Sequence, residues 1–252
     1  MNLQTLTRWK AFALHLVLSA LVAGIVVGLV VFLWYPPPFF AAMGGAVLLR
    51  LLIGVDVVLG PLITLVVFDP AKPGLKFDLA TIVVLQMAAL AYGGYVMFDA
   101  RPVYNVFVKD RFETIAANAV DEASVARAQP EYRQLSMVGP RVVAANQPAN
   151  ADEALTLAMG VMRGGPDVAE LPHLYAPYAQ EAARAGRAAR SLVELSRQSK
   201  ESSDTVSDFV ASHGNGQRNL GYLPARARNR DFAVVVDRKT GEIVGYLALH
   251  PW

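Results

Sequence analysis

The chain has 252 residues, 54% of them hydrophobic, and its 23 Lys+Arg nearly balance its 21 Asp+Glu. It has no cysteine, which excludes disulfides, thiolate catalysis and cysteine-ligated zinc. The balanced charge provides no basic patch for nucleic acid, so we expect no nucleic-acid partner.

Three long apolar segments lie in the first hundred residues, at Ala11 to Trp34, roughly Ala46 to Phe68, and Phe77 to Phe98. Each has about twenty residues or more, enough to cross ~30 Å of hydrocarbon at ~1.5 Å per residue. The basic pair Arg8 and Lys10 before the first segment also fits a cleaved signal peptide, but that segment is too long and two more follow it. We therefore predict three transmembrane helices in residues 1–100.

Lysine and arginine in the short flanks predict the orientation. Arg8 and Lys10 precede the first span, Lys72 and Lys76 lie between the second and third, and the YPPPFF loop has none. The positive-inside rule then makes the N-terminus and the second loop cytoplasmic. After three crossings, residues 101–252 lie outside, which in a bacterium with two membranes is the periplasm. We expect an inner-membrane, multi-pass protein.

One carboxylate, Asp56, stands near the middle of the second span, and Gln86 stands near the middle of the third. A charge at that depth costs at least ~2.5–3.5 kcal/mol, which makes Asp56 a functional candidate. Alternatively, Asp56 is protonated or hydrogen-bonded to Gln86 and holds the bundle together. The sequence leaves both interpretations open.

Two further residues of the second span are candidates. Pro61 cannot donate to the Val57 carbonyl, which frees an acceptor beside Asp56 and predicts a kink. The kinked, polar face of the second span could receive a partner helix or pack inside the bundle. Arg50 lies near the outer end of this span. We expect its side chain to extend to the lipid headgroups rather than to have a functional role.

Catalytic and metal-binding patterns are lacking. His15 has no second histidine or carboxylate at metal spacing, and the chain has no G-x-S-x-G, H-E-x-x-H or Walker motif. The stretch from His213 to Gly216 looks more like a loop than a phosphate cradle. We expect no enzyme, with no catalytic, cofactor-binding or metal-binding residues.

Residues 101–252 are predicted to form a small α+β domain. ARPVYNVFVKDRFETI indicates a buried strand from Val103 to Val108 that leads into a helix, and Pro140 to Asn146 is a further candidate strand. DFAVVVDRKTGEIVGYLALH predicts a C-terminal hairpin that turns at Gly241. Four helices are expected, at Asp152 to Arg163, Pro177 to Arg190, Ser191 to Lys200, and Asp204 to His213, the last with Asp204 as its N-cap.

The order of WYPPPFF, GVDVVLGPLITLVVF, KPGLKFDLA and ARPVYNVFVKDRFE resembles the TfpX/TfpZ family of type IV pilin accessory proteins, over about the first 115 residues. These inner-membrane proteins are likened to FimB-type pilus assembly chaperones. The resemblance implies a non-enzymatic role in pilin stability or pilus assembly, with the major pilin, other pilus assembly components and the lipid bilayer as partners. It carries over no catalytic residues.

A pilin waits in the membrane as one apolar helix with a periplasmic head, so spans and an outer domain could contact both parts. An ionised Asp56 could attract the pilin's α-amine, although its central depth fits poorly with an amine near the cytoplasmic face. Two other classes remain: a membrane-anchored periplasmic sensor, for which the short cytoplasmic loop and tail leave no output domain, and a small transporter or membrane enzyme component, which would need more polar groups in the spans.

Overall fold

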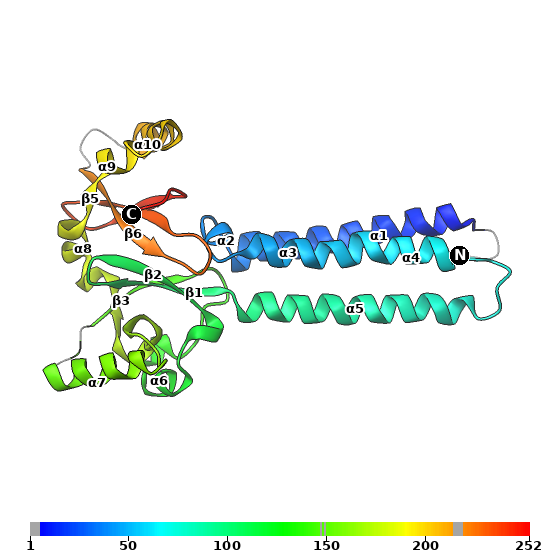
Figure 1. Ribbon diagram of the computed structural model, residues 1–252, viewed down its shortest axis with the longest axis horizontal. Helices are drawn as coiled ribbons and strands as arrows, with labels where there is room; N and C mark the ends of the chain where they lie inside the picture. The colour runs from blue at the N-terminus through cyan, green and yellow to red at the C-terminus, as the bar shows by residue number, and fades with distance from the viewer. Residues whose placement is uncertain (1–5, 147, 149, 214–218) are drawn as a thin grey trace. The chain divides into compact units, whose positions relative to one another are not determined.

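The computed structural model describes residues 6–146, 148, 150–213 and 219–252 (Figure 1). The loop predicted around Gly214–Gly216 lies outside these residues. The chain divides into two compact units. The first consists of Met1–Trp34 and Gly45–Asp99, and the second of Tyr35–Gly44 and Ala100–Trp252.

The first unit consists of three long apolar helices. The bounds of their segments are α1 Arg8–Gly28 with a π-helical end Leu29–Trp34, then α3 Gly45–Ile53 with a π-helical turn Gly54–Leu59 and α4 Gly60–Val67, then α5 Leu75–Asp99. These helices of 27, 23 and 25 residues are long and apolar enough to cross a membrane. The prediction of three helices that could span a membrane is confirmed by their length and composition.

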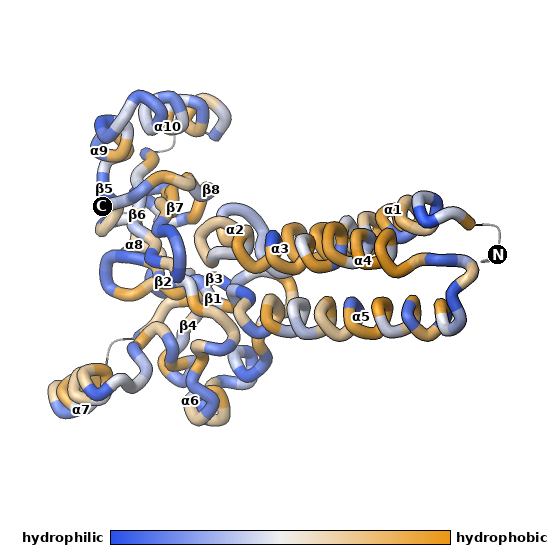
Figure 2. Tube along the Cα trace, turned by 45° about the vertical axis from the view of Figure 1, so that its right-hand side comes forward, coloured by the Kyte–Doolittle hydropathy of each residue, from blue (hydrophilic) through white to orange (hydrophobic). Residues whose placement is uncertain are grey.

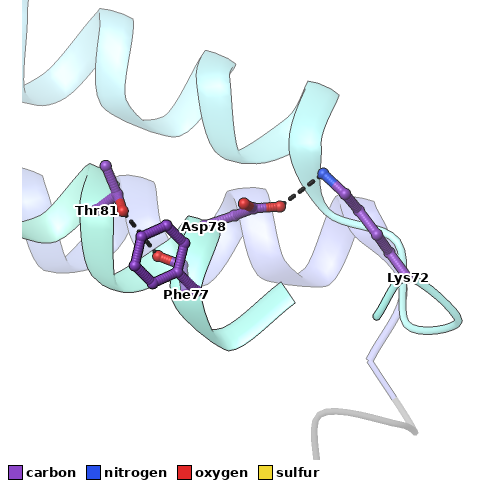
Figure 3. A network of polar contacts seen from close by, with 4 residues as sticks. All are labelled: Lys72, Phe77, Asp78 and Thr81. Atoms are coloured by element: carbon purple, nitrogen blue, oxygen red, sulfur yellow. Dashed lines mark hydrogen bonds and ion pairs between the residues drawn. The ribbon is translucent and has the colours of Figure 1, made fainter. Parts of the chain in front are cut away.

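Polar contacts define the turn between the second and third helices (Figure 3). Lys72 Nζ donates to Asp78 Oδ2 over 2.6 Å, and Thr81 Oγ1 donates to the Phe77 carbonyl over 2.9 Å. Gly74, at φ +91°, provides the left-handed residue before α5 begins. Asp78 lies in the first turn of α5, where a negative charge favours the helix N-terminus.

The first unit exposes many of its large apolar side chains and buries several polar or small residues. Orange, hydrophobic segments dominate its helices in Figure 2. Phe32 is 77% exposed and Val66 is 80% exposed. In contrast, Ser19, Asp56 and Thr64 are buried. This distribution is expected for a bundle whose surroundings are lipid.

The second unit is built on one mixed sheet in the order β4-β3-β1-β2-β6-β7-β8, with β5 paired to β6. The strands are β1 Pro102–Val108, β2 Arg111–Ala116, β3 Arg141–Ala145, β4 Tyr175–Pro177, β5 Arg190–Ser191, β6 Leu220–Arg226, β7 Phe232–Asp237 and β8 Ile243–Leu247. The β1–β3 and β2–β6 pairs are parallel, and the other pairs are antiparallel. The predicted first strand, the strand after Pro140 and the C-terminal hairpin are confirmed.

The predicted helix after the first strand is wrong, because the chain turns back as β2. Lys109 adopts φ +57°, and Asp110 N donates to the Val108 carbonyl over 2.8 Å, closing a tight turn. The inward positions Phe112 and Thr114 of β2 are buried with a period of two residues. That period suits a strand and not a helix.

Of the four helices predicted in the second unit, the one at Asp152 to Arg163 is confirmed within one residue at each end. Those predicted from Pro177 and Ser191 are shorter than expected, and the one that ends at His213 is longer. The helices of this unit are α2 Phe39–Ala42, α6 Glu122–Arg127, α7 Ala151–Met162, α8 Ala182–Ala188, α9 Leu192–Ser196 and α10 Lys200–His213. The helix predicted from Pro177 is interrupted because Tyr175–Pro177 pairs with β3. Asp204 is not an N-cap, since α10 begins four residues earlier and Ser199 Oγ accepts from Ser202 N over 3.0 Å.

The connection between the first two spans packs into the second unit. Within Tyr35–Gly44, the Phe39 ring lies edge-on to Phe232, with 5.5 Å between centroids. The Ala42 carbonyl accepts from the backbone N–H groups of residues 229–230 over 2.8 and 3.1 Å. Although it lies between two long apolar helices in the sequence, this segment contributes to the core of the second unit.

Candidate functional site

A chain of hydrogen bonds links three helices inside the first unit. His15 on α1 lies with Nδ1 2.7 Å from Thr64 Oγ1 on α4. Its Nε2 lies 2.8 Å from Gln86 Oε1 on α5. The Gln86 Nε2 group donates to the main-chain carbonyl of Asp56 over 3.1 Å. We call these four residues, His15, Asp56, Thr64 and Gln86, the polar cluster.

The direction of each hydrogen bond follows from what each atom can do. The Asp56 carbonyl only accepts, so the Gln86 amide nitrogen faces it and the amide oxygen faces His15. For a neutral imidazole, Nε2 must then carry the proton and donate to Gln86. Nδ1 is left as the acceptor of the Thr64 hydroxyl proton. The neutral cluster therefore satisfies the histidine completely.

Gly60 allows Gln86 to approach the second span. A Cβ atom built on Gly60 would lie 1.9 Å from Gln86 Nε2, far inside van der Waals contact. Any side chain at this position would displace the amide from the Asp56 carbonyl. Pro61, the next residue, is buried in the first turn of α4. The missing side chain of Gly60 therefore makes room for the polar cluster.

The Asp56 carboxylate is the unusual group of the cluster. Asp56 is 4% exposed, and among the described residues neither carboxylate oxygen has a hydrogen-bond partner. The residue lies on the π-helical turn Gly54–Leu59, where Gly60 N–H bonds to the Val55 carbonyl. A buried acceptor without a donor is costly. This carboxylate can accept a hydrogen bond or a positive charge from a partner, or carry a proton itself.

The structure brings together Asp56 and Gln86, but through the main chain of Asp56 instead of its side chain. His15 and Thr64 join them, although nothing in the sequence pairs these two residues. Arg50 has no part in the cluster as described: it is exposed, and its Nε donates to the Ala46 carbonyl of its own helix over 3.1 Å.

An apolar hollow of about 340 Å³ adjoins the polar cluster. His15 and Thr64 supply its polar lining. The remaining lining residues are Leu6, Ala11, Leu14, Leu18, Phe68, Leu79 and Val83. This hollow suits apolar chains better than a polar solute.

In the second unit, the closest approach to a catalytic pair is Ser124 and His173. Ser124 Oγ lies 2.6 Å from His173 Nδ1 and accepts from His173 N over 3.0 Å. Burial and the nearby Arg127 lower the pKa of His173. However, Ser124 is fully buried in the structure, so a substrate could not reach its hydroxyl without a rearrangement. Among the described residues, no group of three His, Cys, Asp or Glu could hold a metal ion.

Comparisons with known proteins link the chain to fimbrial assembly. Residues 4–44 match the family model described as Fimbrial assembly protein FimB. The chain is similar to the "Fimbrial assembly protein, serogroup I" and "serogroup E1" of Dichelobacter nodosus, with 34% identity over 172 residues in each case. Each of these alignments covers 67% of this chain and 66% of the relative, slightly less than two thirds of its length.

A third relative is covered more fully. The "Fimbrial assembly protein, serogroups C1 and C2" of the same organism is 38% identical over 110 residues, 42% of this chain and 83% of the relative. No solved structure matches the chain.

Proposed function

Because the chain belongs to the FimB family of fimbrial assembly proteins, we propose that it assists the assembly of type IV pili as a non-catalytic accessory protein. In this proposal it resides in the inner membrane, with the basic flanks Arg8, Lys10, Lys72 and Lys76 in the cytoplasm. Its second unit then lies in the periplasm. The protein would keep the major pilin stable or ready for assembly.

The two-unit architecture supports this proposal. A pilin before assembly consists of an apolar helix in the membrane and a head outside it. A bundle of three apolar helices offers one surface for the helix, and the mixed sheet unit offers another for the head. Two weak contacts linked in one chain bind more tightly than either contact alone. Catalysis is not needed for such a role.

The observation that carries the proposal is the buried carboxylate of Asp56. His15, Thr64 and Gln86 satisfy one another and the main chain, whereas both oxygens of Asp56 lack a donor among the described residues. A polar or cationic group of the pilin helix would supply that donor, once the helices around this buried carboxylate separate to admit it. In a medium of low dielectric, such a hydrogen bond would make binding of a helix that carries a donor much stronger than binding of a wholly apolar helix.

The substitution Asp56→Asn tests this assignment, because it removes the charge and keeps the shape. We expect the pilin to be lost from the material that co-purifies with the protein, while the level of the protein itself stays unchanged. Asp69→Asn is the matched control, since Asp69 is exposed in the turn between the second and third long helices. If Asp56→Asn instead lowers the level of the protein itself, Asp56 holds the bundle together and binds no partner.

A further inference from the structure

Two large apolar side chains, Met137 and Val138, project from a loop of the second unit. Met137 is 57% exposed and Val138 is 64% exposed. They are consecutive and lie outside any helix or strand. Met137 Sδ accepts from Arg101 Nη2 over 3.9 Å, but more than half of each residue remains exposed. We call residues 136–140 the apolar loop.

The apolar loop has a defined turn geometry. Ser136 Oγ donates to the Val138 carbonyl over 3.2 Å and accepts from Val138 N over 3.3 Å. Gly139 has φ +58°, a backbone conformation that favours glycine. These contacts hold the two apolar side chains on the outside of a tight turn.

Two residues next to the membrane-spanning helices support the base of the loop. Arg101 Nε donates to the Ser136 carbonyl over 3.0 Å, and a Cβ built on Gly139 would lie 2.9 Å from Pro36 Cγ. Arg101 is two residues after Asp99, the last residue of α5, and Pro36 is two residues after the end of the first long helix. The apolar loop therefore packs on the segment that follows the first long helix and on the segment that follows α5.

The chain length limits how far this base can lie from the hydrocarbon. Two residues span at most about 7–8 Å, and the headgroup layer is about 5–7 Å thick on each side of a bilayer. The last residue of the first long helix, Trp34, lies against Phe98 near the end of α5, with 5.2 Å between centroids. Such aromatic residues favour the membrane interface.

We propose that the apolar loop inserts Met137 and Val138 into the outer interface of the bilayer and so anchors the second unit to the lipid surface. The partner is the lipid itself, because the chain connections hold the loop base within one headgroup layer of both spans. This anchor is independent of the Asp56 carboxylate. It would exist whether or not the protein binds a pilin.

The absence of cysteine makes a direct test possible. Met137→Cys and Val138→Cys, each in the full chain, are labelled with an environment-sensitive fluorophore and reconstituted into liposomes that contain lipids brominated near the headgroup. Val193→Cys, at a position 53% exposed on α9, is the matched control for the second unit. Val66→Cys, at a position 80% exposed in the second span, reports that the protein has inserted.

We expect a blue shift of the emission and quenching by brominated lipid at positions 137 and 138, as at position 66, and neither at position 193. If position 66 is quenched but positions 137 and 138 give the spectrum of position 193, the proposal is overturned. It is equally overturned if the labels at 137 and 138 become shielded only when a pilin is reconstituted with the protein, because the loop then binds a protein.

Discussion

The two units of the molecule distribute apolar and polar residues in opposite ways. In the first unit, side chains such as Phe32 and Val66 face outward and Thr64 is buried. In the second unit, all six residues of β7, Phe232–Asp237, are buried. The hydrophobic effect stabilises the second unit, whereas lipid removes most of that driving force from the first. Hydrogen bonds and close packing must therefore hold the helices together.

The buried acids of the two units also differ, in the hydrogen bonds that their carboxylates accept. Asp237 in the second unit is buried, but its Oδ1 accepts from Lys239 N over 2.7 Å and from Thr240 N over 3.3 Å. The Asp56 carboxylate in the first unit has no such donor among the described residues. Neighbouring backbone N–H groups thus satisfy the carboxylate of Asp237, whereas that of Asp56 is left for the partner that we propose.

The largest effect should come from matched truncations of one residue type in the two units. Phe107→Ala removes a fully buried ring from the sheet core and should destabilise the second unit by about 3–5 kcal/mol. Phe32→Ala removes a ring that is 77% exposed and should cost little, since lipid replaces its contacts. Thermal unfolding of the full chain in detergent, followed by circular dichroism, measures both. Equal losses of stability would contradict the claim that the two units bury and expose apolar side chains in opposite ways.

A smaller effect is expected from filling the space at Gly60. The new Cβ of Gly60→Ala would overlap Gln86 Nε2, so the amide must leave the Asp56 carbonyl, at a cost of about 1 kcal/mol. Gly54→Ala is the control, because a Cβ there meets no atom within 4 Å. Unfolding in mixed micelles compares the two variants. A Gly54→Ala variant as unstable as Gly60→Ala would show that helix geometry, and not the contact with Gln86, sets the loss.

The hydrogen bond between His15 and Gln86 should contribute still less. A double-mutant cycle with His15→Phe and Gln86→Leu isolates the interaction between the two side chains. Interhelical hydrogen bonds in membranes average about 0.6 kcal/mol, and we expect a coupling energy of that size from the same unfolding measurement. If the stability losses of the two single substitutions are strictly additive, the hydrogen bond between His15 and Gln86 does not help to hold the bundle together.

The smallest effect concerns a strand residue of the second unit, Glu113. Burial, followed by the charge of Asp167, raises the pKa of Glu113. The folded chain therefore binds the proton more tightly than the unfolded chain, and stability falls as pH rises from the unfolded pKa through the raised folded pKa.

The substitution Glu113→Gln removes this titration. We expect the variant to be at least as stable as the wild-type chain at neutral pH, with the difference disappearing at acid pH, where Glu113 is protonated. Unfolding midpoints measured across the pH range test this. A variant that loses stability only at neutral pH would mean that ionised Glu113 is favoured by Arg226 and Arg111 instead.

The sequence predicted those features of the structure that depend on residues close together in the chain. Length and hydropathy indicated the three spans, and the depths of Asp56 and Gln86 indicated their proximity. The contact of Phe39 with Phe232 joins positions far apart in the chain, which no local period encodes. Similarly, the pairing of His15 with Thr64 and Gln86 depends on helix rotation. The turn at Lys109 has a residue type unusual for positive φ, so the strand β2 was mistaken for a helix.

The central claim, contact with a pilin through both units, is tested most directly by photocrosslinking in cells that make pili. One photoreactive residue replaces Val58, which is 52% exposed on the second long helix, two residues after Asp56 in the sequence. Another replaces the exposed Lys239 in the turn between β7 and β8. The account predicts that pilin is crosslinked from both positions. Recovery of pilin from neither position would contradict it.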